Sequence, residues 1–297
     1  MNYKSPISNQ DFPVLHKSVL VDGIRIFYRE AGPLETPTIL LLHGFPSSSR
    51  MFLNLFPLLS SRYHLVAPDY PGFGQSDAPP PENFSYTFDH ISQCLEKFLV
   101  EINLVQYTLY LQDYGGPVGF RLATAHPECV KALIIQNAVA HVEGLSDAWS
   151  IRKAFWENRT LYEGKIRAAL LSKENACQRH LAGVSLPERI DPDTWSDEYA
   201  FLTRPGMVDI QIDLMFDYQT NVASYPKWQA YLREYQPRTL VVWGKHDPLF
   251  TVDGAMALGR EIRDSEIHLL NASHFALDEE AETISLLIHR FIDRVFS

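Results

Sequence analysis

Short runs of apolar residues alternate along the first part of the chain with segments whose apolar positions recur at helical spacing. The apolar runs are continuous, which indicates strands that are buried on both faces of a mostly parallel sheet. Two further β-rich segments are separated by Asp22-Gly23, a strong hairpin signal. The expected strands are residues 18–21, 24–28, 38–42, 64–67, 107–112 and 130–135. This order predicts a doubly wound α/β sheet, with ligands beyond the carboxyl ends of its strands.

The alternation stops after Asn137. Residues 141–235 contain helical segments broken by prolines, and they are rich in tryptophan and tyrosine. An aromatic helical insertion between sheet strands is a candidate lid, although most of its aromatic side chains are expected to pack its own core. Strand character returns at residues 238–243 and 266–270, and an amphipathic helix follows. We therefore predict a core formed by residues 1–139 and 236–297 and a helical cap, residues 140–235, inserted after the sixth strand.

The stretch from Tyr107 to Gly119 joins a strand to a helix through one polar residue and two glycines. The strand ends at Asp113, and Gly115 and Gly116 follow almost directly. A sharp turn of this kind, a nucleophile elbow, lifts the central side chain clear of the sheet beside the N–H groups of the following helix. The alternative is that Asp113 caps that helix. A carboxylate nucleophile suits attack on a saturated carbon, because the product is an ester that water can cleave.

Two more polar residues follow later strands of the expected sheet. Asp247 comes after the strand at 238–243, and His274 comes after the strand at 266–270. Taken singly, an aspartate before proline is often a turn residue, and a lone histidine is often a surface or core group. Because the carboxyl ends of parallel strands meet at one edge, we expect both side chains to lie near Asp113. The order nucleophile, acid, histidine predicts a catalytic triad in which Asp247 orients His274.

Composition narrows the classes of function further. The net charge of −10 argues against nucleic-acid binding, which needs a basic face. No apolar run approaches membrane-spanning length, and residues 1–13 lack the apolar segment of a signal peptide. The three cysteines, Cys94, Cys129 and Cys177, are far apart and form neither a disulfide framework nor a metal spacing. We expect a cytoplasmic protein, with Cys94 in the core and no metal or organic cofactor.

Four motifs give the chain a family resemblance. It resembles the aspartate-nucleophile branch of the α/β-hydrolase fold, which contains epoxide hydrolases and haloalkane dehalogenases. The likeness covers nearly the whole chain, and residues 218–227 are similar to a cap segment of the dehalogenases. The motifs that carry the resemblance are H-G-F-P at 43–46, Q-D-Y-G-G at 112–116, W-G-K-H-D at 243–247 and A-S-H-F at 272–275.

The resemblance implies a mechanism in two steps. Asp113 attacks a saturated carbon and forms an alkyl-enzyme ester, and His274 then activates the water that cleaves this ester. The backbone N–H groups of Phe45 and Tyr114 are expected to hold the oxyanion. Two residues depart from the dehalogenase pattern: Tyr114 replaces the tryptophan that follows the nucleophile, and Phe45 replaces an asparagine. Both groups hold the halide in those enzymes, so their replacement favours an epoxide.

The leaving group decides between the two activities. An opening epoxide needs a proton donor such as a tyrosine hydroxyl, for which we predict Tyr225 first and Tyr162 second, whereas Trp156 could hold a halide from the cap. We therefore expect an epoxide hydrolase that converts an epoxide to a diol, with a haloalkane dehalogenase as the alternative. A non-catalytic binding protein is a third reading. The expected partners are a small apolar electrophile and water, and both a monomer and a homodimer remain open.

Overall fold

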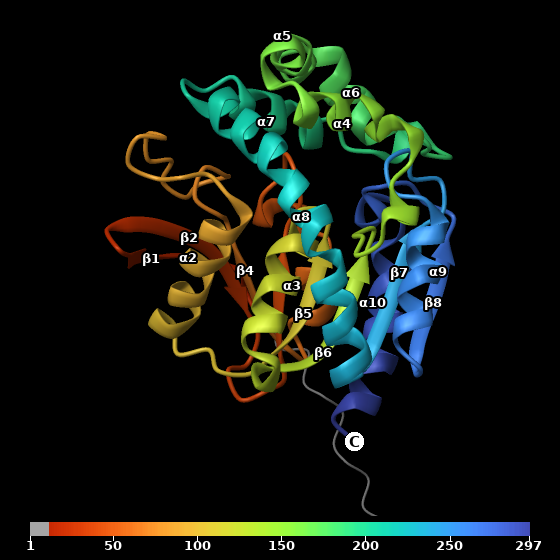
Figure 1. Ribbon diagram of the computed structural model, residues 1–297. Coiled ribbons are helices and arrows are strands. Elements are labelled where there is room, and N and C mark those ends of the chain that lie inside the picture. The colour runs from red at the N-terminus through yellow and green to blue at the C-terminus, as the bar shows by residue number, and fades with distance from the viewer. Residues whose placement is uncertain (1–11) are drawn as a thin grey trace, which may run out of the picture.

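The computed structural model describes residues 12–297 and contains one eight-stranded sheet with the order β1-β2-β4-β3-β5-β6-β7-β8 (Figure 1). The first two strands form the predicted hairpin, and β2 pairs antiparallel with β4, whereas all later pairs are parallel. The strands are β1 (Leu15–Val21), β2 (Ile24–Ala31), β3 (Thr38–Leu42), β4 (His64–Pro68), β5 (Tyr107–Gln112), β6 (Val130–Gln136), β7 (Thr239–Gly244) and β8 (Ser265–Leu270). The predicted doubly wound, mostly parallel sheet is confirmed.

Helices cover both faces of the sheet because successive residues of the central strands point to opposite sides. In β5, Leu109 and Leu111 belong to the core under α2, α3 and α9, whereas Tyr110 packs into the core under α1 and α10. The helices of the core are α1 (Phe56–Leu59), α2 (Phe88–Glu101), α3 (Gly115–Ala125), α9 (Val252–Glu261) and α10 (Ala276–Val295). These two hydrophobic layers hold the strand ends, and with them the polar residues that follow each strand, in fixed positions.

The segment between β3 and β4 has apolar residues at helical spacing but forms no single continuous helix. The segment after Ser47–Ser49 forms a 3-10 turn, Ser49–Phe52, and then the single-turn helix α1. Pro57 explains why one continuous helix does not form, because proline has no N–H to donate to the preceding turn. The Ser48 side chain accepts a hydrogen bond from the Arg50 N–H, as expected for a cap in this region.

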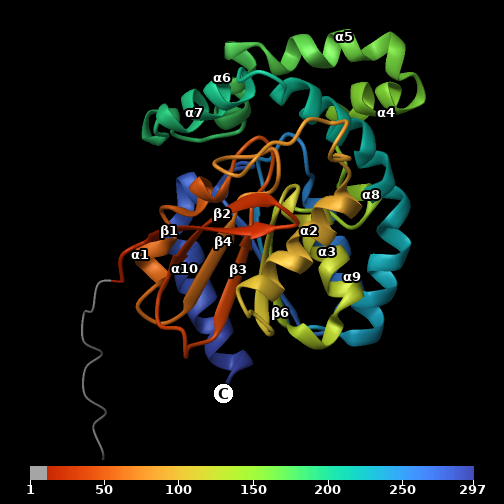
Figure 2. The same ribbon diagram turned by 90° about the vertical axis from the view of Figure 1, so that its left-hand side faces the viewer.

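Five helices separate β6 from β7 and lie beyond the carboxyl ends of the parallel strands (Figures 1 and 2). The last of them, α8, runs from this layer down the side of α3 and contains Pro226. These helices are α4 (Ser150–Glu157), α5 (Arg159–Leu170), α6 (Lys173–Leu181), α7 (Asp193–Leu202) and α8 (Met207–Tyr235). The helical cap after the sixth strand is thus present, whereas its division from the core at residues 139/140 and 235/236 stays a prediction.

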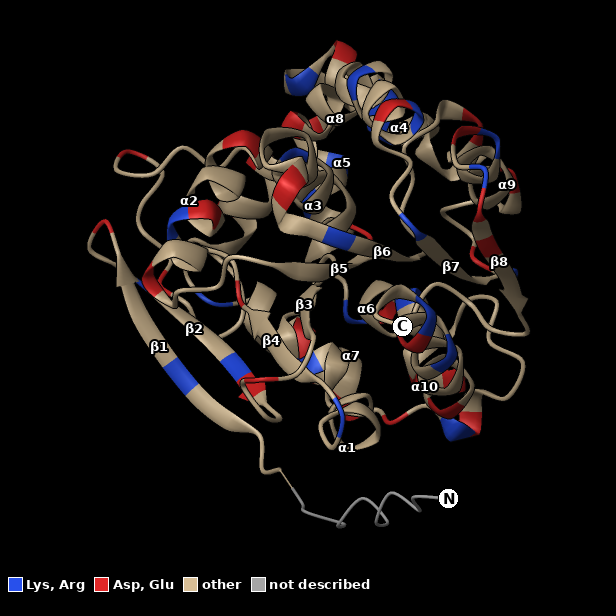
Figure 3. Ribbon diagram, turned by 90° about the horizontal axis from the view of Figure 1, so that it is seen from below, with Lys and Arg blue, Asp and Glu red and all other residues tan. Residues whose placement is uncertain are grey.

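Charges of both signs are spread over the described residues. Seen from below, Lys and Arg positions are interspersed with Asp and Glu positions, for example along α10 (Figure 3). Cys94 is buried, as predicted. Within residues 12–297, none of the helices is long and apolar enough to cross a bilayer. The N-terminal segment for which we expect no signal peptide lies almost entirely outside the described residues.

His180 forms contacts that link the cap to the core. Its ring, on α6, stacks on Phe275 with the centroids 4.1 Å apart, and Phe275 directly follows His274 in the core. His180 Nε2 lies 2.7 Å from Glu198 Oε2 on α7, and Nδ1 lies 3.6 Å from Asp278 Oδ2 on α10. Burial lowers the pKa of His180, but the two carboxylates outweigh this and raise it from 6.5 to about 9. A protonated imidazole therefore ties two cap helices to the core at neutral pH.

This link predicts a pH dependence of stability. A raised histidine pKa contributes stability that is complete below pH 6.5 and is lost as the pH rises towards 9, on the order of 2 to 3 kcal/mol. The free energy of unfolding from urea titrations should therefore fall more between pH 6.5 and 9 for the wild type than for His180→Gln. His126, which is exposed and 3.8 Å from Glu96, provides the control substitution His126→Gln. Equal pH dependence in the wild type and His180→Gln would contradict the link.

Candidate active site

The turn after β5 has the geometry of a nucleophile elbow. Asp113 adopts a left-handed conformation with φ +47°, and α3 begins two residues later at Gly115. The helix crosses the sheet so closely that a Cβ at residue 115 would lie 2.0 Å from the Leu42 carbonyl oxygen. Only glycine allows this approach. The capping position of α3 is Tyr114 and carries no side-chain cap bond, so the alternative that Asp113 serves as the helix cap is wrong.

The Asp113 carboxylate is buried and points towards the loop after β3. Its Oδ1 accepts a 2.7 Å hydrogen bond from the Phe45 N–H. Burial raises the pKa of Asp113, while the charge of His274 and the N–H groups of Phe45 and Tyr114 oppose that rise. The two predicted oxyanion N–H groups therefore both act on this carboxylate, which leaves Oδ2 as the oxygen on the side of His274.

His274 lies between the two aspartates, as the sequence predicts. Its Nδ1 donates to Asp247 Oδ2 at 2.7 Å, and its Nε2 lies 3.9 Å from Asp113 Oδ2. Burial lowers the pKa of His274, but the charge and hydrogen bond of Asp247 raise it above its ordinary value, with Asp113 adding to the rise. The ring is thus oriented with Nε2 towards Asp113, the position that a general base needs.

Two residues that the sequence analysis missed hold this arrangement. Asn137, the first residue after β6, donates from Nδ2 to Asp247 Oδ2 at 2.8 Å and accepts from the Gly244 N–H. Gln112 Nε2 lies 3.1 Å from His274 Nε2. When the ring is neutral and Nδ1–H is donated to Asp247, the Nε2 lone pair can accept from the Gln112 amide. Both residues could have been selected from the sequence, because they stand at the carboxyl ends of β5 and β6, where site residues of a parallel sheet are expected.

A small, partly open cavity of about 30 Å³ lies in front of Asp113, between core and cap. It is lined by Phe45, Asp113, Tyr114, Trp149, Arg152, Arg179, Met215, Tyr218, Leu249 and His274. The cap contributes two arginines, Arg152 and Arg179, that the sequence analysis did not select. The cavity has room for only a few atoms, since a single water needs roughly 10 to 15 Å³.

The tyrosine that faces the nucleophile is Tyr218, not the predicted Tyr225. Tyr218 lines the cavity, and burial raises its pKa well above 10, with the Asp113 charge adding to the rise. Tyr225 is also buried, and its hydroxyl lies beside that of Tyr218, but Tyr225 is not among the residues that line the cavity. It has no hydrogen bond of good geometry within residues 12–297. Tyr218 is therefore the cap tyrosine that lines the cavity, and its raised pKa keeps the hydroxyl protonated at neutral pH.

The other two predicted cap residues do not line this cavity. Trp156 stacks on the outer side of Tyr218, and its Nε1–H donates to the Met215 carbonyl oxygen at 2.8 Å, so it is not free to hold a leaving group. Tyr162 is only partly buried, and the Lys165 ammonium lies 5.4 Å from its ring centroid. The prediction of these two side chains as leaving-group partners is therefore corrected, because each is turned towards other cap residues.

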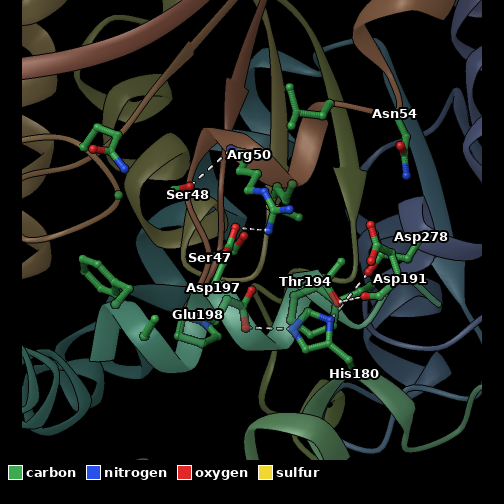
Figure 4. Close-up of a pocket in the computed structure, with 18 of the residues that line it drawn as sticks. Ser47, Ser48, Arg50, Asn54, His180, Asp191, Thr194, Asp197, Glu198 and Asp278 are labelled. Atoms are coloured by element: carbon green, nitrogen blue, oxygen red, sulfur yellow. Dashed lines mark hydrogen bonds and ion pairs between the residues drawn. The ribbon is translucent and has the colours of Figure 1, made fainter. Parts of the chain in front are cut away.

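A larger cavity of about 350 Å³ lies behind this site, between α6, α7 and the loops after β3 and β4 (Figure 4). Three of its lining residues, Pro46, His180 and Phe275, are the direct chain neighbours of Phe45, Arg179 and His274. The two cavities thus share the same three wall segments. Figure 4 shows His180 paired with Glu198 at one side of the larger cavity.

Comparisons with known proteins agree with this geometry. The family model described as alpha/beta hydrolase fold matches residues 37–281. An uncharacterized hydrolase of Saccharomyces cerevisiae is 38% identical to this chain, covering 91% of it and 94% of the relative. A haloalkane dehalogenase of Mycobacterium marinum is 28% identical over 88% of this chain and 86% of its own length. Epoxide hydrolase 2 of Caenorhabditis elegans is 24% identical, covering 94% and 80%. The chain therefore belongs to the alpha/beta hydrolase family and is a hydrolase.

Proposed function

We propose that this hydrolase opens epoxides through a covalent ester on Asp113. The observation that carries the proposal is a buried carboxylate that shares one small cavity with the His274 imidazole and the Tyr218 hydroxyl. Asp113 lies 3.9 Å from the base that would release its ester, and the phenol is the proton donor that an opening epoxide needs. The predicted roles of Asp113, Asp247 and His274 remain those of nucleophile, orienting acid and base.

In the first step, Asp113 Oδ2 attacks one carbon of the epoxide and forms a C–O ester bond. The bond between that carbon and the epoxide oxygen breaks, and its electron pair goes to the oxygen. Tyr218 gives its proton to the resulting alkoxide. Burial keeps the Tyr218 pKa well above 10, so the hydroxyl is protonated and able to donate throughout the neutral range. No atom of the substrate leaves the enzyme in this step.

In the second step, His274 Nε2 removes a proton from water, and the hydroxide attacks the ester carbonyl of Asp113. The tetrahedral intermediate collapses, the bond between the acyl carbon and the alkyl oxygen breaks, and the imidazolium gives its proton to this oxygen, which releases the diol. The carboxyl group of Asp113 then loses its proton, and Tyr218 is reprotonated, so both groups return to their starting forms.

The N–H groups of Phe45 and Tyr114, which already act on the carboxylate, stabilise the oxyanion. Esterification removes the Asp113 charge, one of the causes that raise the His274 pKa. The imidazole therefore becomes easier to deprotonate at the stage where it must act as a base, while Asp247 keeps it oriented.

Haloalkane dehalogenation is the second candidate, and the relative from Mycobacterium marinum favours it. A halide needs N–H donors in the cavity, usually indoles in such a site. Here both cap indoles beside the cavity donate elsewhere, Trp149 to the Leu249 carbonyl oxygen at 3.1 Å and Trp156 to that of Met215. The cap indoles therefore provide no donor for a halide. The guanidiniums of Arg152 and Arg179 do line the cavity, so the preference for an epoxide rests on the Tyr218 hydroxyl. Binding without turnover, the third reading, offers no reason for a base oriented towards a buried carboxylate.

Removing the base should trap the covalent intermediate. In His274→Gln the ester on Asp113 should form but persist, and intact-protein mass spectrometry should show an adduct within one turnover. An epoxide adds its entire mass, whereas a haloalkane adds its mass without hydrogen halide, so the same spectrum distinguishes the two candidates. The control His274→Gln/Asp113→Asn should stay unmodified. If His274→Gln carried no adduct on the peptide containing Asp113, the ester mechanism would be wrong.

Substituting the two tyrosines of α8 separately tests which one donates the proton. Tyr218→Phe should lower kcat for an epoxide about 10²- to 10⁴-fold, the usual contribution of a general acid. Tyr225→Phe, the matched control, should change kcat less than about 10-fold because its hydroxyl does not line the cavity. Steady-state diol formation measures both. Equal losses in the two variants, or a larger loss in Tyr225→Phe, would remove Tyr218 from the mechanism.

A further inference from the structure

The guanidinium of Arg179 lies near the nucleophile Asp113 but forms no ion pair with a carboxylate among the described residues. It comes from α6 and lines the same cavity as Asp113. Its guanidinium carbon lies 5.2 Å from the ring centroid of Phe45, and its Nη1 is buried without a hydrogen-bond partner among the described residues. Burial lowers the pKa of this guanidinium, which shows that its enclosure is costly. A buried, unpaired donor of this kind calls for an acceptor that the chain itself does not supply.

Arg152, from α4, lines the cavity as well. Its guanidinium carbon lies 4.9 Å from the ring centroid of Trp149, a wall residue whose own N–H is donated to Leu249. The other arginines of the neighbouring cap helices are paired: Arg159 with Asp213, and Arg167 with Asp209. Within residues 12–297, by contrast, no carboxylate oxygen comes within 4 Å of the guanidinium of Arg152 or Arg179. Among the arginines of α4, α5 and α6, the two without a carboxylate partner in the described part of the chain are thus the two that line the cavity. Arg189 and Arg204, which also lack such a partner there, line the larger cavity instead.

The two carboxylates whose charges act on Arg179, Glu198 and Asp113, have other hydrogen-bond partners. Glu198, whose charge acts on Arg179, holds His180 at 2.7 Å. Among the described residues, Asp113 is the only carboxylate that lines the cavity, and its Oδ1 accepts the hydrogen bond of the Phe45 N–H. The lining therefore carries one negative and two positive charges even when His274 is neutral. Esterification of Asp113 removes the single negative charge, which would leave both guanidiniums uncompensated around an apolar substrate.

We propose that Arg152 and Arg179 bind a carboxylate of the substrate, so that the enzyme acts on small carboxylic acids that carry an epoxide or a carbon–halogen bond. This inference rests on the proposed function and replaces the expectation of an apolar substrate. Guanidinium groups stacked on aromatic rings present their N–H edges for two-point recognition of a carboxylate. The acid group is held by the cap arginines, and the neighbouring electrophilic carbon faces Asp113 Oδ2. The small cavity restricts the substrate to a few carbon atoms.

A different role for the two arginines is to keep Asp113 ionised. Arg152 does oppose the rise of the Asp113 pKa, but burial is the larger effect, and His274 and two backbone N–H groups already oppose it. Charge stabilisation alone predicts that the variants lose activity equally towards charged and neutral substrates. Recognition of a carboxylate predicts that the variants lose activity towards the charged substrate only. Comparing an acid with its matched neutral amide distinguishes the two roles.

The experiment compares acids with their isosteric amides in the full-length enzyme. Glycidate and glycidamide form the epoxide pair, and 2-chloropropionate and 2-chloropropionamide form the halide pair. In whichever of the two pairs the enzyme turns over, the wild type should have a kcat/KM at least about 10-fold higher for the acid than for the amide. Arg152→Gln and Arg179→Gln should each reduce this preference about 10- to 100-fold, mainly through KM. Lys153→Gln, which removes an exposed charge next to Arg152 on α4, should leave it unchanged.

Ligand-induced stabilisation provides a measurement that does not depend on turnover. Propionate should raise the melting temperature of the wild type and propionamide should not, because only a ligand that binds the folded state stabilises it. Arg152→Gln and Arg179→Gln should lose this shift. Without ligand, Arg179→Gln should be at least as stable as the wild type, since it removes an unpaired buried charge. A loss of stability in that variant without any change in acid preference would assign Arg179 a structural role.

The outcomes separate this inference from the proposed function. Equal turnover of acids and amides, or no stabilisation by propionate, overturns the carboxylate site while the ester mechanism stands. A different outcome would refute the proposed function and leave the carboxylate site intact. In that case no electrophile is turned over and His274→Gln carries no adduct, but propionate stabilises the wild type and neither arginine variant. Both the ester mechanism and the carboxylate site are supported if the wild type prefers the acid, if both arginine variants lose this preference, and if Lys153→Gln keeps it.

Discussion

The structure depends on one buried carboxylate held at a left-handed turn between a strand and a helix. Burial opposes the charge of Asp113, and the protein compensates with backbone N–H groups at Phe45 and Tyr114 and with the charge of His274. Each of these groups reaches Asp113 from a different strand end, so the position of the carboxylate follows from the register of the parallel sheet. The close approach of α3 at Gly115 fixes the same turn from the other side.

The cap completes the site by adding side chains to those that the core supplies. The core provides a nucleophile, a base and oxyanion N–H groups, and the cap adds a phenol and two guanidinium groups that line the cavity in front of Asp113. Tyr218 on α8 and the two arginines on α4 and α6 provide these groups. His180 holds α6 against Phe275, which follows His274, so the cap arginines and the base are positioned through adjoining residues. The chemistry therefore depends on a closed contact between cap and core.

Much of this arrangement could be predicted from the chain alone. The continuous apolar runs mark the buried strands, and the polar residues that follow them, Asp113, Asp247 and His274, come together because parallel strands end at one edge. Asn137 and Gln112 carry the same positional signal but were passed over, since amides lack the charge that marks a catalytic role. Between Ser48 and Leu59 the apolar spacing alone suggests one helix, because this spacing does not reveal the effect of Pro57.

The orientation of cap residues could not be predicted in this way. Tyr218 and Tyr225 are seven residues apart on α8, so they share one face of the helix and differ by about 10 Å along its axis. Which of them faces the nucleophile depends on how far α8 extends over the core, and that is a tertiary property. Arg152 and Arg179 were missed for a related reason, since a charged residue on an amphipathic helix is normally solvent-exposed.

The central claim is that Asp113 bonds to the substrate before water enters the reaction. A single turnover with enzyme in excess, run in water labelled with oxygen-18, tests it most directly. Our account predicts that the label enters the carboxylate of the peptide containing Asp113, and that the product of this first turnover is unlabelled. Label in the product and none in Asp113 would show that water attacks the substrate directly, which would contradict the account.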